Sequence, residues 1–346
     1  MLPHPGGGGE TYVDSLAGMD RYRFERVFLA RRREVVQALP SLAMNAPRVN
    51  LAAGRHDIVH THGEVASSFC LPALARRPSV ITLHGLNLVR RLSGPRGRVA
   101  AFNLRLLVRA AARTICVSPV ERDEVLEVVG SAGSGRIVVV PNGVEVAALP
   151  TPEARAAARA DLGIRNGEVV VVAVGALDTP KDPLTPARAA IAAAARGIPI
   201  VLLFVGEGNL RPQVEEAVRG QEEVVRVLGH RDDVSRVLAA ADLFALSSHR
   251  EGLPYALLEA MAGGLPAIVS DYAGATDVVG DAGIIVRRGD LDGFARALER
   301  VATDASERLL LGERARARIA RLFSLDEMVA RTREIYDSAL EERSRR

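Results

Sequence analysis

Two glutamates, Glu251 and Glu259, stand eight residues apart in a stretch that leaves one predicted strand and enters a predicted helix. Glu251 is followed by Gly252, Leu253 and Pro254, and proline suits the first position of a helix because it has no N–H to leave unpaired there. Eight helical residues correspond to about 800°, so on one continuous helix the two carboxylates would lie about 80° apart. With Glu251 in the loop before the helix, the two acids can instead reach different parts of one ligand.

The flanking residues predict two buried strands on either side of this helix. Residues 243–246 and 267–269 are short apolar runs, which are typical of a parallel sheet. Open parallel sheets bind ligands beyond the carboxyl ends of their strands, so Glu251 is expected to face such a crevice. The N–H groups of Gly252 and Leu253 lie at the positive end of the helix, which suits hydroxyl or anion oxygens. The alternative is an ordinary buried helix with two surface glutamates, and a bare pair of acids does not exclude it.

Two histidines close predicted strands in the first half of the chain. Residues 58–60 read as a strand that ends in a polar tip at His62, and residues 80–85 repeat the design with His84 at the tip. A histidine at the carboxyl end of a strand faces the ligand crevice more readily than one in its middle. The alternative is that each histidine is bonded to nearby backbone.

One pair of glycines and one lysine are further candidates. Gly8 and Gly9 belong to a glycine run at residues 5–10, ahead of a helix predicted over 11–17. A glycine run that opens a helix can bring N–H groups close to phosphate or sugar oxygens, although a flexible N-terminus is the simpler reading. Lys181, the only lysine of the chain, follows a strand predicted over 169–175.

The segment from Ser248 to Asp271 carries a long pattern, S-x-x-E-G-L-P-x-x-x-L-E-A-M-A-x-G-x-P-x-I-x-S-D. It resembles the donor-binding core of the retaining glycosyltransferases of family 4. The resemblance implies an α/β protein of the GT-B fold, in which two Rossmann-like domains face each other across a cleft and the C-terminal helix crosses back. The domains expected here are 1–145, 146–325, and a C-terminal helix and tail at 326–346.

The resemblance implies a role for each matching position. The catalytic residues would be His84, Glu251 and Lys181, with Lys181 gripping the donor's diphosphate. The donor-binding residues would be Gly8, Gly9, Gly206, Gly208, Gly252, Leu253 and Glu259, and the acceptor-side residues Glu10 and His62. The implied reaction moves a sugar from a nucleotide diphosphate sugar to an acceptor hydroxyl in cell-envelope glycan, exopolysaccharide or glycolipid synthesis. No metal and no further cofactor are expected.

The chain departs from the family pattern at two places. Ala176 stands where the family carries an arginine for the diphosphate, and a charge-assisted contact of this kind is worth about 1.5–3 kcal/mol. Too few residues precede the glycine run to form the usual first strand, so we expect the true start to lie upstream. These departures keep open a degenerate protein that binds a nucleotide sugar or a partner. A nucleotide-sugar epimerase of the same architecture is disfavoured, because it should lack the E-G-L-P-x-x-x-L-E pattern.

Composition adds limits on partners and location. The 346 residues suit two domains, and the two cysteines lie in apolar surroundings, as expected of reduced thiols in the cytoplasm. Residues 1–150 hold 19 arginines against 12 acids, a net charge of +7, whereas the remainder has a net charge of −4. A basic half can meet an anionic membrane at its inner face, and residues 86–113 read either as an interfacial helix or as a core helix with a basic face. With 4% aromatic residues and no matching motif, nucleic acid is not expected as a partner.

Overall fold

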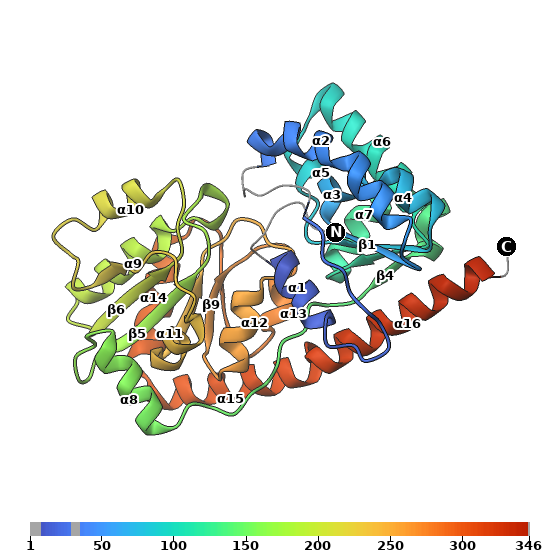
Figure 1. Ribbon diagram of the computed structural model, residues 1–346. Coiled ribbons are helices and arrows are strands. Elements are labelled where there is room, and N and C mark those ends of the chain that lie inside the picture. Colours follow the sequence, from blue (N-terminus) through green and yellow to red (C-terminus); the bar gives the residue numbers. More distant parts are fainter. Residues whose placement is uncertain (1–7, 29–34, 345–346) are drawn as a thin grey trace. The chain divides into compact units, whose positions relative to one another are not determined.

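The computed structural model describes residues 8–28 and 35–344, which form two compact units. Unit 1 runs to Gly143 and also includes the C-terminal segment from Leu325; unit 2 is Val144–Ser324. Each unit is built around its own parallel sheet with helices packed against it (Figure 1). No helix in the described ranges combines the length and apolar character needed to cross a bilayer.

The sheet of unit 1 has four parallel strands in the order β1-β2-β3-β4. The strands are β1 Val59–His62, β2 Ser79–Leu83, β3 Arg113–Cys116 and β4 Ile137–Val139. The helices are α1 Gly8–Leu16, α2 Val35–Ala53, α3 Gly63–Phe69, α4 Leu71–Arg76, α5 Asn87–Arg91, α6 Gly94–Ala110, α7 Pro119–Val129, the short 3-10 helix η1 Ser131–Arg136, and α16 Leu325–Ser344. Leu83, Leu107 and Val125 are among the buried residues of its core, and both cysteines are buried.

The C-terminal helix α16 packs on unit 1 although it follows unit 2 in the chain. The hydroxyls of Tyr12 and Thr332 lie 3.0 Å apart, and the Tyr22 hydroxyl donates to Asp337. Arg331 donates from Nη2 to the carbonyl of Val139 at 2.8 Å. The predicted return of the last helix to the N-terminal part of the chain is therefore confirmed.

The sheet of unit 2 has six parallel strands in the order β10-β9-β8-β5-β6-β7. The strands are β5 Val169–Val174, β6 Ile200–Val205, β7 Val225–Val227, β8 Leu243–Leu246, β9 Ala267–Ser270 and β10 Gly283–Val286. The helices are α8 Pro152–Asp161, the 3-10 helix η2 Thr179–Lys181, α9 Leu184–Ala195, α10 Arg211–Ala217, α11 Val234–Ala240, α12 Tyr255–Ala262, α13 Ala275–Val279, α14 Leu291–Thr303 and α15 Ala305–Leu322. Strand order reverses between β5 and β8, so the loops after these two strands flank the topological switch point at which such sheets bind ligands.

Continuous apolar sequence explains the central strands of unit 2. β6 is buried at every residue and β5 at its first four, as expected of parallel strands covered on both faces. The alanine-rich helix α9 packs closely with α14 on one side of the sheet, and α12 packs with α15. This core positions the carboxyl ends of β5 and β8 side by side.

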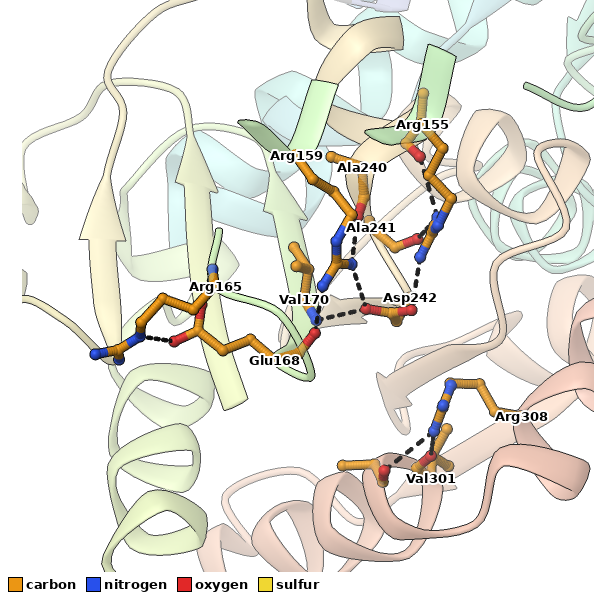
Figure 2. A network of polar contacts seen from close by, with 12 residues as sticks. Arg155, Arg159, Arg165, Glu168, Val170, Ala240, Ala241, Asp242, Val301 and Arg308 are labelled. Atoms are coloured by element: carbon orange, nitrogen blue, oxygen red, sulfur yellow. Dashed lines mark hydrogen bonds and ion pairs between the residues drawn. The ribbon is translucent and has the colours of Figure 1, made fainter. Parts of the chain in front are cut away.

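A polar clamp ties helix α8 to the opposite, amino-terminal ends of the same two strands (Figure 2). Asp242 Oδ1 binds Arg155 Nη2 at 2.6 Å, and Asp242 Oδ2 binds Arg159 Nη1 at 3.0 Å. Asp242 Oδ2 also accepts from the Val170 N–H at 2.7 Å, and Arg155 donates to the Ala241 carbonyl. The carboxylate thus joins α8, β5 and the start of β8 in one hydrogen-bonded network.

The structure corrects several predicted element boundaries. Helix α12 begins at Tyr255, and Pro254 precedes it in an extended conformation with ψ of 118°. Residues 291–322 are divided into α14 and α15 at Asp304, whose side chain accepts from the Glu307 N–H. Helix α1 begins within the glycine run at Gly8, not at residue 11.

Candidate functional site

Lys181 and Glu251 meet across the switch point of unit 2. Lys181 ends η2 in the loop after β5, and Glu251 lies in the loop after β8. The Lys181 Nζ atom is 2.6 Å from Glu251 Oε1, and the Ser248 hydroxyl donates to the same oxygen at 2.5 Å. The Glu251 side chain is 10% exposed and the Lys181 side chain 29%, so the pair is shielded but reachable from solvent.

Local hydrogen bonds hold the lysine loop in place. The Asp178 side chain accepts from the Lys181 N–H, and Asp182 adopts a left-handed conformation with φ of 47°. The Ser247 hydroxyl donates to the carbonyls of Lys181 and Asp182, at 3.0 and 2.7 Å. Residues of both loops, including Gly175 and Ser247, line a small pocket together with Lys181.

Gly206 and Gly208 are required by the close packing of neighbouring loops. A Cβ atom on Gly206 would lie 2.0 Å from the Gly175 carbonyl oxygen, and one on Gly208 would lie 2.1 Å from that of Leu177. Gly206 also has a φ of 142°, which side-chain-bearing residues rarely adopt. The two glycines therefore hold the loop after β6 against the loop that carries Lys181.

Glu259 lies on α12, about one turn from its start at Tyr255. Its side chain is half-buried, and burial raises the pKa of its carboxyl. Within the described residues the Glu259 carboxylate makes no hydrogen bond or ion pair, so its oxygens remain available as acceptors. Gly252 and Leu253 stand between Glu251 and the start of the helix, and Leu253 is buried.

In unit 1 the structure brings His62 and His84 together at the carboxyl ends of β1 and β2. His62 Nδ1 lies 3.1 Å from His84 Nε2, and the two rings are stacked. Burial lowers the pKa of His84 to about 4 and that of His62 well below its usual value. Both rings are therefore neutral near pH 7, so one nitrogen donates and the other accepts.

Sequence reasoning missed the residues that surround this histidine pair. His60 Nε2 binds the Thr82 hydroxyl at 2.7 Å, and its Nδ1 binds the Tyr336 hydroxyl of α16 at 2.6 Å. The Tyr12 ring contacts the rings of His60, His62 and His84. Tyr12 and Tyr336 lie far from the histidines in sequence, so no local pattern could have indicated them.

A buried carboxylate holds the turn after His84. Glu121 accepts from the N–H groups of Gly85 and Val117, the latter at 2.7 Å, and burial raises the pKa of this carboxyl to about 7. Gly85 has a φ of 97°, so the turn requires glycine. The one sequence signal was Ser118 three residues before Glu121, a pairing that marks helix starts.

The remaining predicted residues lie at the start of unit 1. Gly8 and Gly9 form the first turn of α1, where N–H groups have no partner within the helix. The rest of the glycine run, Gly6 and Gly7, lies outside the described residues. Glu10 lies 3.7 Å from Arg26.

The position that departs from the family pattern, Ala176, is exposed beside the lysine loop. Arg288 is an arginine that the structure brings to the same end of the sheet, because it donates from Nη1 to the His249 carbonyl in the loop that carries Glu251. Arg288 is far from His249 in sequence, so no local pattern indicated this contact.

Two family descriptions match separate parts of the chain. Residues 5–148 match the Glycosyltransferase Family 4 description, and residues 168–304 match the description Glycosyl transferases group 1. Together they span most of both units. The chain belongs to the family 4, group 1 glycosyltransferases, and it is a nucleotide-sugar glycosyltransferase of the GT-B fold.

Similar curated proteins act on several acceptors. The chain is 29% identical over 301 residues to the UDP-Gal:alpha-D-GlcNAc-diphosphoundecaprenol alpha-1,3-galactosyltransferase of Escherichia coli, covering 82% of this chain and 75% of that protein. It is 31% identical over 289 residues to the D-inositol 3-phosphate glycosyltransferase of Nocardia farcinica, covering 77% of this chain and 63% of the relative.

Solved structures share the fold at low identity. Anabaena Alr3699/HepE, crystallised with UDP and glucose, has a TM-score of 0.81 at 21% identity, over 97% of this chain and 98% of that one. Sucrose-phosphate synthase from Thermosynechococcus elongatus has a TM-score of 0.73 at 21% identity, over 92% and 82% of the two chains. The predicted GT-B fold is thereby confirmed.

Proposed function

We propose that this protein transfers a sugar, with retention of configuration, from a UDP-sugar to a hydroxyl of a glycolipid or envelope glycan. The observation that carries the proposal is the shielded Lys181–Glu251 pair at the switch point of unit 2. The solved structure with UDP and glucose and the relative that uses UDP-Gal favour uridine as the base.

Lys181 binds the leaving diphosphate and stabilises its charge. Charge builds on the bridging oxygen as the sugar–phosphate bond breaks, and a fixed cation stabilises that charge. The ammonium is held beside Glu251 by a contact of 2.6 Å between Nζ and Oε1, so it needs little reorganisation. The loop after β6, which contains Gly206 and Gly208, packs closely against the loop that carries Lys181.

The two glutamates serve different parts of the donor. Glu251, with the backbone of Gly252 and Leu253, orients the sugar, and Glu259 accepts from the ribose hydroxyls. Support for the second role is the Glu259 carboxylate itself, which is half-buried and makes no bond within the described chain. A hydroxyl pair is the neutral donor that such an acceptor suits.

His84 acts near the reacting face, and His62 and Glu10 on the acceptor side, with Gly8 and Gly9 contacting the donor. The neutral state of His84 supports this role, because an uncharged imidazole can accept or donate a hydrogen bond to a sugar hydroxyl. The single nitrogen contact with His62 fixes the orientation of the ring.

A basic and apolar surface on α6 supports a lipid-linked acceptor at the inner face of a membrane. Val99 and Phe102 are 67% and 58% exposed, while Leu104 and Leu107 are buried. The helix contains no acidic residue, and its exposed arginines are Arg96, Arg98, Arg105 and Arg109. Exposed apolar side chains among arginines suit an anionic lipid surface.

Turnover with a panel of UDP-, GDP- and ADP-sugars tests the proposed reaction. We expect release of UDP from one sugar donor, and at least a 100-fold loss of this rate in Glu251→Ala. The exposed Glu313→Ala in the same unit is the matched control and should behave as wild type. Binding of UDP-sugars without any turnover would instead favour a degenerate binding protein.

Cosedimentation with vesicles of phosphatidylcholine and 30% phosphatidylglycerol tests the membrane contact. Wild type should bind at low salt, and Phe102→Ser should bind less. Equal sedimentation with pure phosphatidylcholine vesicles, or none with either, would refute the contact.

A further inference from the structure

One buried hydroxyl in unit 2 has no hydrogen-bond partner in the part of the chain the structure describes. It belongs to Tyr272, whose side chain is among the largest fully enclosed ones, with 2% of the residue exposed. The main chain of Tyr272 is satisfied, because its N–H donates to the Ser270 carbonyl and its own carbonyl accepts from Ala275, both at 2.9 Å. Native proteins rarely bury a hydroxyl unpaired, so this one requires an explanation.

Tyr272 lies at the ligand-binding end of the sheet. It follows strand β9, which pairs with β8 in parallel up to the register pair Leu246 and Val269. The loops that continue from these two neighbouring strands carry Glu251 and Tyr272, respectively. In agreement with this placement, burial raises the pKa of the Tyr272 phenol and the Glu251 carboxylate raises it further, so the hydroxyl is a protonated donor.

The Glu251 carboxylate can accept a further hydrogen bond. Lys181 and Ser248 both bond to Glu251 Oε1, and Oε2 accepts no bond from any residue the structure describes. A phosphate oxygen suits the pair less well, because it can accept from the phenol but cannot donate to the Glu251 carboxylate. A sugar hydroxyl suits the pair, because it can donate to a carboxylate and accept from a phenol at once.

We infer that Tyr272 donates a hydrogen bond to a sugar hydroxyl of the donor that Glu251 also binds, and so helps to select the sugar. The inference rests on the proposed donor site and adds a residue that the family pattern did not indicate. It applies to the sugar and not to the nucleotide.

Tyr272→Phe separates this role from a structural one, with Tyr336→Phe as the matched control. Both changes remove one buried phenol oxygen, but the Tyr336 hydroxyl is bonded to His60. We expect Tyr336→Phe to lower the melting temperature, because it breaks the bond to His60. Tyr272→Phe should leave the melting temperature equal or higher, because an unpaired hydroxyl is costly to bury.

Calorimetric titration completes the test, with UDP, UDP-glucose, UDP-galactose and UDP-N-acetylglucosamine titrated separately. Tyr272→Phe should bind UDP as wild type does and bind the preferred UDP-sugar about 5- to 10-fold more weakly. Unchanged UDP-sugar affinity, or a fall in melting temperature like that of Tyr336→Phe, would overturn this inference but leave the proposed function standing. If wild type binds none of the four ligands, the proposed function fails and the inference fails with it.

Discussion

At the scale of single residues, Lys181 can be labelled selectively, because it is the only lysine in the chain. An amine reagent such as trinitrobenzenesulfonate can modify two amines, this side chain and the N-terminus, and the two thiols with which it could also react are buried. We expect UDP to slow labelling of Lys181 at least 5-fold, since the diphosphate would cover the ammonium. Peptide mass spectrometry measures the rate, and the N-terminal amine is the internal control. Equal labelling with and without UDP would place the diphosphate elsewhere.

Ala176 allows a gain-of-affinity prediction. The residue is exposed beside the lysine loop, so an arginine can be accommodated there without a core clash. Ala176→Arg should tighten UDP binding about 10-fold, because a charge-assisted contact is worth about 1.5–3 kcal/mol. Calorimetry measures the change, and Ala176→Gln is the neutral control. An unaltered affinity would indicate that another cation, such as Arg288, already serves the diphosphate.

The neutral histidines predict loss of stability in acid. Burial holds the pKa of His84 at about 4 and the pKa values of His60 and His62 well below 6.5. The unfolded chain therefore binds more protons than the folded chain below pH 6.5, and stability falls as the pH drops from about 6.5 towards 4. Glu121, whose pKa is raised to about 7, contributes the opposite slope between pH 4.5 and 7.

His84→Asn isolates one of these groups. Near pH 5 it should flatten the dependence of unfolding free energy on pH by about 1 kcal/mol per pH unit, the contribution of nearly one proton. Urea unfolding at several pH values measures the slope. Parallel slopes for the variant and wild type would mean that His84 is not held neutral by burial.

At the scale of elements, the clamp around Asp242 predicts where unit 2 is vulnerable. Asp242→Ala would leave Arg155, Arg159 and the Val170 N–H without their shared acceptor. We expect a loss of about 3 kcal/mol, or a fall in melting temperature of about 6–10 °C. Differential scanning calorimetry of the full chain measures it, with the fully exposed Asp232→Ala as control. A melting temperature equal to that of the control would mean that the Asp242 network does not stabilise unit 2.

Elements with continuous apolar sequence were predictable, and their boundaries were less so. The strands predicted over residues 169–175 and 243–246 lie where their unbroken apolar runs placed them. The sequence does not indicate the break at Asp304, because helical periodicity continues on both sides of it. Helix α2 was not predicted, since Pro47 interrupts its pattern and nothing local indicates the packing that stabilises it.

At the scale of the whole molecule, the fold followed from one long motif, whereas the surroundings of the site did not. The pattern from Ser248 to Asp271 indicated the GT-B fold, and the loop residues it contains meet Lys181 from a distant strand. The partners from α1 and α16 that enclose the histidines came only from tertiary packing. Local sequence encodes the chemistry of a site, and the fold decides which distant side chains support it.

Two crossings of the chain link the units. They occur at Gly143–Val144 and at Ser324–Leu325. Val144 forms a bridge with Ser324, and its N–H donates to the Phe323 carbonyl at 2.9 Å, so the two crossings lie next to each other. Residues 141–144, Pro-Asn-Gly-Val, are therefore where the chain leaves unit 1.

Calorimetric binding of UDP and of the preferred UDP-sugar to Lys181→Ala and Glu251→Ala tests the central claim most directly. We predict that Lys181→Ala weakens both ligands by at least 10-fold, whereas Glu251→Ala weakens the UDP-sugar much more than UDP. Glu313→Ala should match wild type. Wild-type affinity for both ligands in both site variants would contradict the assignment of this ion pair to the donor.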